Sequence, residues 1–424
     1  MAKVRKAYPL SAVRSMALHA QGLLAAPAPP TLDGLEAMID RLVCVQIDTL
    51  QMVHRSQYLL LWSRFGNYDP RDLDRLIFGT VNVDGKKSKK NDRRAFEYWL
   101  KEACIIPLKD YRYSLALKRW RQEENRHWWQ TWLEDKVNHD ILDHVRTRID
   151  SEGGLRTSDF EYEGPRRSSW WDWKPAKLAL EHLYNTGEMM IANRINFQRV
   201  YDMTERVLPS WVDATEPTMD ERNRYYLERS VRAHGVCFPL QAADYTHTKR
   251  SAVKTLVAQM IEEGLFVTVP ATLADGKTHH MIVHRDDLKT LNKAADKALP
   301  PTRTTFLTPF DSLFWGLQRD KQLFDFNQTL ECYKPEPQRI WGYFCLPILH
   351  KDRLVGRFDP KLERNTGTLR IKALHLEPGI APDEALVADV AGSMRDFLAF
   401  HKAQTLVIEK SNPEEFGAAL MKAM

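Results

Sequence analysis

Helical periodicity dominates the first hundred residues of the chain. Apolar residues recur there every three or four positions, and Pro- or Gly-containing segments interrupt the pattern where helices should stop. One short stretch instead alternates between apolar and polar residues, as expected for a strand. The predicted elements are helices over residues 8–24 and 33–42, a strand over residues 43–50, a helix ending near Phe65 and a helix that Pro70 opens.

The strand predicted over residues 43–50 groups two polar side chains. Val45 and Ile47 point to one face, so Gln46 and Asp48 lie together on the other, because residues i and i+2 of a strand share a face. A Gln on a short strand is often only half-exposed, and an Asp beside a helix is often a cap. The pattern alone therefore leaves a structural role open for both residues.

A repeated pattern is the most informative structural feature further along the chain. Residues 174–192 and 251–269 each read as an amphipathic helix, a Gly (Gly187 or Gly264) and an apolar extended run. A helix that ends at Gly and leads into a two-stranded ribbon is typical of a winged helix. An Asp-Gly turn predicts that residues 278–284 form the returning strand of the second ribbon.

The pattern changes again near residue 300, where short apolar runs are separated by Pro, Gly and charged residues. This pattern favours a small β domain followed by helices. Helices are expected before the repeats as well, over residues 109–150. The elements predicted in the last third are strands over residues 340–349, 353–358, 368–376 and 406–409, a helix over residues 382–402 and a terminal helix.

Residues 79–94 predict a basic loop, with six basic side chains against two acidic ones. A solvated surface loop is one interpretation, and an arm that contacts phosphates is the other.

Composition narrows the class of protein. Five widely spaced cysteines with no Cys-x-x-Cys pair indicate neither a disulfide framework nor a structural zinc site. The chain lacks an 18-residue apolar run and a signal-peptide pattern, so we expect a soluble cytoplasmic protein. His279, His280 and His284 are expected to be surface imidazoles, with no metal and no other cofactor predicted. The net charge of +5 permits nucleic-acid binding without requiring it.

Short segments spread in order over residues 8–400 together resemble a known enzyme family. They include residues 45–50, 61–65, 95–99, 187–189, 199–209, 307–315, 346–349 and 354–359. The family is the winged-helix interstrand-crosslink DNA glycosylases, the AlkZ-like and YcaQ-like group.

The resemblance implies an α+β fold in which three tandem winged helices precede a small C-terminal β-barrel, arranged around a DNA-binding cleft. The repeats at Gly187 and Gly264 indicate two of these modules independently. The implied domains are a first winged helix with a helical extension, two further winged helices and a β-barrel domain with C-terminal helices. They would span residues 1–165, 166–230, 231–299 and 300–424, respectively.

The family's catalytic signature is Gln, an apolar residue, then Gln or Asp, and it maps onto Gln46, Ile47 and Asp48. An N-alkylated cationic purine is already a fair leaving group, so the enzyme chiefly needs an anion near the developing oxocarbenium ion and an oriented water. The resemblance assigns the anion and general base to Asp48 and the water-holding amide to Gln46. No lysine nucleophile is implied, so we expect a monofunctional glycosylase that also unhooks N7-linked interstrand crosslinks.

The expected partner is double-stranded DNA that carries alkylated bases or crosslinks. The protein is expected to be a monomer associated with the nucleoid. Glu97 and Asp311 are expected to cap helices or form salt bridges. The alternative is a non-catalytic winged-helix regulator that binds an operator and releases no base. Basic residues flanking the matched segments are candidates for DNA contact or, equally, for ion pairs: Arg55, Arg64, Arg194, Arg199, Arg357 and Lys361.

Overall fold

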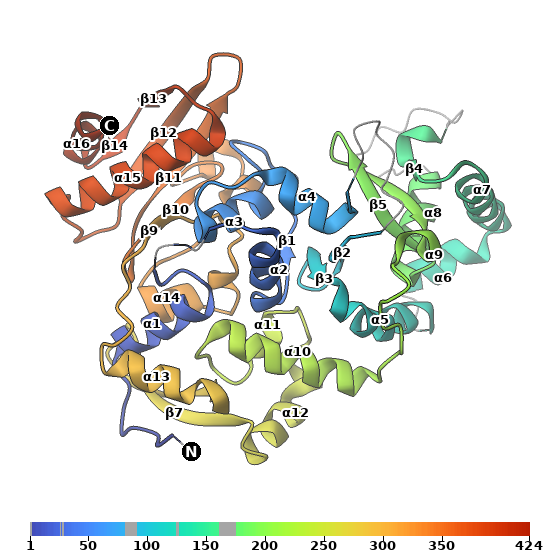
Figure 1. Cartoon of the computed structure of the whole chain (residues 1–424), viewed down its shortest axis with the longest axis horizontal. Coiled ribbons are helices and arrows are strands. Elements are labelled where there is room, and N and C mark those ends of the chain that lie inside the picture. The colour runs from blue at the N-terminus through green and yellow to red at the C-terminus, as the bar shows by residue number, and fades with distance from the viewer. Residues whose placement is uncertain (1, 26, 28, 81–90, 124–126, 161–174) are drawn as a thin grey trace. The chain divides into compact units, whose positions relative to one another are not determined.

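Figure 1 shows the computed structural model, which describes residues 2–25, 27, 29–80, 91–123, 127–160 and 175–424. Most of the predicted basic loop lies outside the described residues. The chain folds into two compact units. Unit 1 comprises Met1–Leu73, Trp99–Cys104 and Asn223–Met424, and unit 2 comprises Asp74–Tyr98 and Ile105–Arg222. The four sequence-based domain boundaries stay a prediction.

Unit 1 contains both ends of the chain. Its helices are α1 (Leu10–Ala20), α2 (Leu32–Arg41), α3 (Ser56–Phe65), α11 (Gln241–Asp244), α12 (Arg250–Glu262), α13 (Leu288–Ala295), α14 (Arg319–Phe324), α15 (Glu384–His401) and α16 (Glu414–Ala423). Its strands are β1 (Val45–Gln46), β7 (Phe266–Thr272), β8 (Thr278–His284), β9 (Thr304–Phe306), β10 (Leu346–His350), β11 (Arg353–Glu363), β12 (Thr368–Leu376), β13 (Thr405–Ile408) and β14 (Ser411–Asn412).

Among the α-helices and strands of the described residues, four have residues in both units and eight lie in unit 2 alone. The first group is α4 (Pro70–Phe78), β2 (Ala95–Trp99), β3 (Ala103–Pro107) and α10 (Met219–His234). The second is α5 (Tyr111–Glu123), α6 (His127–Glu134), α7 (Lys136–Glu152), β4 (Leu155–Arg156), α8 (Pro175–Thr186), β5 (Met189–Ile195), β6 (Gln198–Met203) and α9 (Thr204–Val207).

The two helix–Gly–ribbon predictions are confirmed. In unit 2, α8 leads through Gly187 into the β5–β6 hairpin, and β4 extends this sheet in the order β4-β6-β5. In unit 1, α12 leads through Gly264 into the β7–β8 hairpin. Both glycines have positive φ, 89° and 70°, a conformation that a residue with a side chain adopts with strain. The number of winged-helix modules stays a prediction.

The N-terminal segment is part of the core of unit 1. The Tyr8 N–H donates to the Pro270 carbonyl at 2.9 Å, and the Thr272 N–H donates to the Tyr8 carbonyl at 2.8 Å. Tyr8 thus extends the β7–β8 ribbon, and α1, which follows it, packs against α13. This arrangement buries most of the apolar face of α1, from Ala12 to Ala20.

The C-terminal sheet curls as a half-barrel with strand order β13-β12-β11-β10-β9, and β14 also pairs with β12. Helix α15 packs against β9 and β10 (Figure 1). Phe397 of α15 is buried, with its ring centroid 5.5 Å from that of Phe306 and 4.9 Å from that of Trp62 on α3. These contacts attach the helix that follows the Gln46–Asp48 segment to the sheet.

One strand prediction is wrong in its first half. Residues 340–345 were expected to start a strand, but β10 begins at Leu346. The backbone N–H groups of Ile340 and Trp341 donate instead to the Glu331 carboxylate, at 2.9 and 2.7 Å. These donors are therefore not available for strand pairing.

No helix among the described residues is long and apolar enough to cross a membrane.

Candidate active site

Gln46 and Asp48 lie where a short strand ends. Strand β1 covers only Val45–Gln46, so the strand predicted over residues 43–50 is too long. Val43 has a φ of 68°, which breaks the extended conformation before the strand. Beyond it, the Ile47 N–H still donates to the Ala103 carbonyl at 2.8 Å, whereas the Asp48 N–H turns to Gln57 Oε1 at 3.3 Å. Asp48 therefore lies in an irregular segment just after the strand.

Both side chains line a cavity of about 600 Å³ within unit 1. Its walls combine aromatic rings with charged groups, and most come from segments far from residue 46. The aromatic residues are Trp99, Phe310, Phe314, Trp315 and Tyr333, and the charged ones besides Asp48 are Lys101, Glu102, Asp311 and Asp320. Aromatic walls with a few polar groups are typical of a site that binds a flat, partly polar ligand.

Burial controls the ionisation of Asp48. Desolvation raises the pKa of its carboxyl, and a hydrogen bond from the Leu50 N–H to Oδ1, at 2.7 Å, opposes this only in part. A carboxylate held partly away from water is a stronger base and interacts more strongly with a nearby positive charge. Asp48 is therefore suited to act as a base or as an anion beside a cationic centre.

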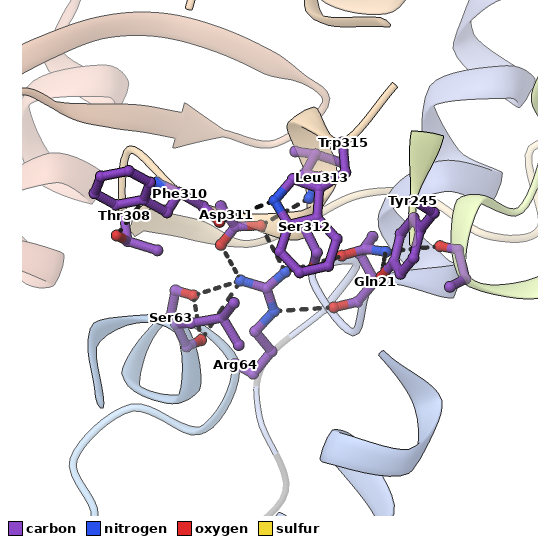
Figure 2. Close-up of polar contacts among 12 residues, drawn as sticks. Gln21, Ser63, Arg64, Tyr245, Thr308, Phe310, Asp311, Ser312, Leu313 and Trp315 are labelled. Carbon is purple, nitrogen blue, oxygen red and sulfur yellow. Dashed lines mark hydrogen bonds and ion pairs between the residues drawn. The ribbon is translucent and has the colours of Figure 1, made fainter. Parts of the chain in front are cut away.

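One residue of the cavity wall, Asp311, belongs to a buried ion pair (Figure 2). Arg64 on α3 and Asp311 have side chains that are 0% exposed, and Arg64 Nη2 donates to Asp311 Oδ1 at 2.8 Å. Arg64 also donates to Ser63 Oγ at 2.8 Å and to the Gln21 carbonyl at 3.1 Å. Asp311 Oδ1 accepts the Leu313 N–H at 3.0 Å as an N-cap. The charges are thus paired and additionally hydrogen-bonded, as buried ions require.

The same network reaches the segment that carries Gln46. The Gln21 side chain donates to the Tyr245 hydroxyl at 3.3 Å, and that hydroxyl donates to the Leu42 carbonyl at 2.9 Å (Figure 2 draws Tyr245). The Tyr245 ring also packs against Trp315, with centroids 4.9 Å apart. The start of β1 and the aromatic wall of the cavity are therefore held by one set of contacts.

The chain after Asp48 is tethered to the C-terminal sheet. The Leu362 N–H donates to the Met52 carbonyl at 2.9 Å, and Arg364 Nη2 donates to the Val53 carbonyl at 2.5 Å. Leu362 is the last but one residue of β11, and Arg364 lies in the turn that leads to β12. The Asp48 segment is thus held by backbone hydrogen bonds both before and after it, which limits its conformational freedom.

Of the six residues predicted to contact DNA, four are engaged in ion pairs. Arg64 and Arg357 are buried, and Arg357 pairs with Glu377 at 2.6 Å. In unit 2, Arg194 pairs with Glu97 at 2.7 Å and Arg199 pairs with Glu181 at 2.9 Å. A buried guanidinium cannot reach a phosphate, so we do not retain Arg64 and Arg357 as DNA contacts. The salt bridges predicted for Glu97 and Asp311 are confirmed.

The two remaining candidates differ in exposure. Lys361 is exposed and Arg55 is half-buried. Both flank the tethered Asp48 segment in unit 1, Arg55 by sequence and Lys361 next to Leu362.

Sequence reasoning missed several residues that line the cavity. Lys101 and Glu102 come from the turn between β2 and β3, His247 follows α11, and Tyr333 belongs to a loop before β10. No local periodicity marks these positions. For Lys101 and Glu102 alone, a signal was their position just after the matched segment 95–99.

An α+β chain with helix–ribbon hairpins and a carboxylate in an aromatic cavity fits the class of enzymes that act on nucleic-acid bases. A family model described as "DNA glycosylase AlkZ-like" matches residues 39–400. The chain therefore belongs to the AlkZ-like DNA glycosylase family, which confirms the resemblance read from the sequence.

Among solved structures, the Streptomyces sahachiroi DNA glycosylase AlkZ is similar, with a TM-score of 0.61 and 14% identity. The match covers 94% of this chain and 98% of that chain, and it confirms the mixed α+β fold.

Proposed function

We propose that this DNA glycosylase hydrolyses the N-glycosidic bond of N-alkylated, cationic purines, with Asp48 and Gln46 as its catalytic residues. The observation that carries the proposal is the placement of both side chains in an aromatic cavity of about 600 Å³. An aromatic ring face attracts a cation as well as stacking on a flat base, so such walls favour a charged purine over a neutral one.

The proposed chemistry divides between the two residues. A purine alkylated at N7 or N3 leaves as a neutral base, so no strong general acid is needed. Asp48 stabilises the positive charge that develops on the sugar and takes a proton from the attacking water. Gln46 orients that water through its amide. The water oxygen bonds to C1′ as the C1′–N bond breaks, and the bonding pair departs with the base.

We further propose that the product is an abasic site in an intact strand. Lys101 is the one lysine in the cavity wall among the residues that the structure describes. Its Nζ donates to the Asp244 carbonyl at 3.2 Å and lies 5.6 Å from the centre of the Trp315 ring. Because these contacts already hold its amine, Lys101 is not proposed as the nucleophile, and water is the proposed attacking group.

The same site is proposed to unhook N7-linked interstrand crosslinks. Such a substrate keeps a second strand attached to the leaving base, so the cavity must admit a base without enclosing it. Tyr333, at the cavity wall, is 74% exposed, which is consistent with an open entrance. Arg55 and Lys361 remain the proposed phosphate contacts in unit 1, and three winged-helix modules remain the proposed architecture.

The test is incubation of the purified protein with a duplex that carries one N7-methylguanine and, separately, one N7-linked crosslink. We expect free base, separated strands from the crosslink, and strand breaks only after heat or alkali. Borohydride is expected to trap no covalent complex. Strand cleavage without alkali, together with borohydride trapping that Lys101→Ala abolishes, would contradict the hydrolytic mechanism.

A parallel experiment separates the enzyme from the operator-binding alternative. A regulator would bind a selected duplex far more tightly than random sequence and release no base. Repair enzymes are expected to bind undamaged DNA in a sequence-indifferent, salt-sensitive manner. Selective binding without base release would favour the regulator.

The pH dependence of excision follows from the raised pKa of Asp48. The base must be ionised, so the single-turnover rate is expected to fall about tenfold per pH unit below that pKa. Because desolvation raises the pKa, the midpoint is expected above the ordinary aspartate value. The check is a pH–rate profile on N7-methylguanine DNA, corrected for spontaneous depurination. A profile that is flat down to the ordinary aspartate pKa would contradict the assignment.

A further inference from the structure

An aromatic side chain without a catalytic assignment stands exposed beside the proposed catalytic carboxylate. Tyr333 lines the same cavity as Asp48, yet 74% of its surface is open to solvent. Partial burial is the largest cause that raises the pKa of its phenol, and the charge of Asp48 acts in the same direction. A tyrosine ring that is exposed at the wall of a cavity is available to stack on a ligand.

The loop that carries Tyr333 is organised around a buried carboxylate. Glu331, the residue before Cys332, accepts the N–H groups of Ile340, Trp341 and Gly342 and pairs with Lys334 at 3.1 Å. Burial acts to raise the pKa of Glu331, but these hydrogen bonds outweigh it and lower the pKa. One ionised side chain thus closes residues 331–342 into a fixed loop.

Strand β11 fixes this loop a second time. The Asp359 carboxylate accepts the Tyr343 and Phe344 N–H groups at 2.8 and 3.0 Å. The Arg357 guanidinium lies between two rings, 4.0 Å from the centre of Phe326 and 4.5 Å from that of Trp341. Arg357 also donates to the Asn327 carbonyl at 3.0 Å. The exposed ring of Tyr333 is therefore presented on a rigid support, not on a free loop.

We propose that Tyr333 is a substrate-binding residue that stacks its ring on the damaged nucleobase at the entrance of the cavity. This inference rests on the proposed function, because it takes the cavity at Asp48 as the site of base release. Stacking on an aromatic side chain is tolerant of the base's identity, and a positive charge on the base strengthens it through the ring's π electrons. The ring would thus favour the alkylated, cationic base.

Preorganisation of the Tyr333 ring explains why buried charges would hold the loop that carries it. A ring fixed before binding loses little conformational freedom when a base stacks on it, so more of the stacking energy appears as affinity. A loop needed only to close the fold would not require an exposed tyrosine at position 333. Ile340 on the same loop is also exposed, 71%, but does not line the cavity.

The test compares Tyr333→Leu and Tyr333→Phe with the wild type on duplexes containing N7-methylguanine. We expect Tyr333→Leu to lower single-turnover excision at subsaturating enzyme by about 10- to 100-fold, the range of one base–aromatic stack. Tyr333→Phe keeps the ring and is expected to stay within about threefold of wild type. Tyr333→Leu is expected to weaken the affinity for damaged DNA and to leave the affinity for undamaged duplex unchanged. The thermal midpoint of unfolding should also be unchanged, because the ring is exposed.

Two further variants make the result decisive. Ile340→Ala, on the same loop but outside the cavity, is expected to match the wild type. Glu331→Gln removes the charge that closes the loop and is expected to weaken binding of damaged DNA as Tyr333→Leu does. If Tyr333→Leu excises normally while the wild type is active, the stacking proposal fails and the proposed function stands. If the wild type releases no base, the proposed function itself fails.

Discussion

Replacing Asp48 with Asn is expected to lower base excision by roughly 10²- to 10⁴-fold, the usual contribution of a general base. The variant keeps an oxygen that can accept the Leu50 N–H but loses both the proton acceptor and the negative charge beside the sugar. The measurement is single-turnover release of N7-methylguanine from a duplex, followed by alkali to reveal abasic sites.

The fold itself should tolerate this change. Desolvation raises the pKa of Asp48, so the folded protein holds its ionised form less favourably than the unfolded chain does. At neutral pH the ionised carboxylate therefore costs stability, and a neutral Asn is expected to leave the urea midpoint unchanged or raise it. A loss of activity without a loss of stability would identify a catalytic role.

Glu102→Gln supplies a matched control, since Glu102 is another carboxylate in the wall of the same cavity. Its side chain is 51% exposed and lies 3.4 Å from His247. We expect this variant to excise base within a few-fold of wild type. Equal base release by wild type and Asp48→Asn, or an equal defect in Glu102→Gln, would contradict the assignment of Asp48. Gln46→Ala should reduce the rate less than Asp48→Asn, because it removes orientation of the water but not the base.

Breaking the buried Arg64–Asp311 pair is expected to have the largest effect on stability. Arg64→Ala leaves the Asp311 carboxylate buried and without its cation, which typically costs about 3–5 kcal/mol in the free energy of unfolding. Asp311→Ala should cost as much, because it leaves the Arg64 guanidinium buried without its anion. It also removes the acceptor of the Leu313 N–H. The measurement is urea-induced unfolding followed by tryptophan fluorescence, with Trp315 packed near the network.

Two comparisons separate charge burial from general sensitivity to mutation. Arg224→Ala breaks the exposed pair with Glu263, whose side chains are 40% and 48% exposed, and should cost about 0–1 kcal/mol. The double variant Arg64→Met with Asp311→Asn removes both charges while an amide oxygen can still cap Leu313. It is expected to be more stable than either single Ala variant. If both single variants unfold like the wild type, the pair does not stabilise unit 1.

The burial of Arg64 also revises how the matched sequence segments should be read. Arg64 and Arg357 were predicted as phosphate contacts because they flank recognisable motifs. In the folded chain both are buried instead: Arg64 pairs with Asp311, which lines the cavity, and Arg357 packs on Trp341 of the loop that carries Tyr333. A basic residue next to a motif can therefore stabilise the site from inside the fold as readily as it can contact the substrate.

Several features were determined by the sequence alone because their causes are local. Hydrophobic periodicity and the glycines at 187 and 264 were enough to predict both helix–ribbon hairpins, since only neighbouring residues decide a helix end with positive φ. The matched segments were enough for the family, now supported over residues 39–400. The same segments nominated Gln46 and Asp48, and the structure places both in one cavity.

Only the tertiary structure decided which charges are buried and what surrounds Asp48. Arg64 and Asp311 are 247 positions apart in the chain, and Tyr333 is still further from Asp48. Alternation could not reveal that β1 stops at Gln46, because its end depends on hydrogen bonds to Ala103 and Gln57. The desolvation of a side chain and its long-range ion pairs depend on contacts with segments that are remote in the sequence. A pattern read along the chain does not show which remote segments will meet.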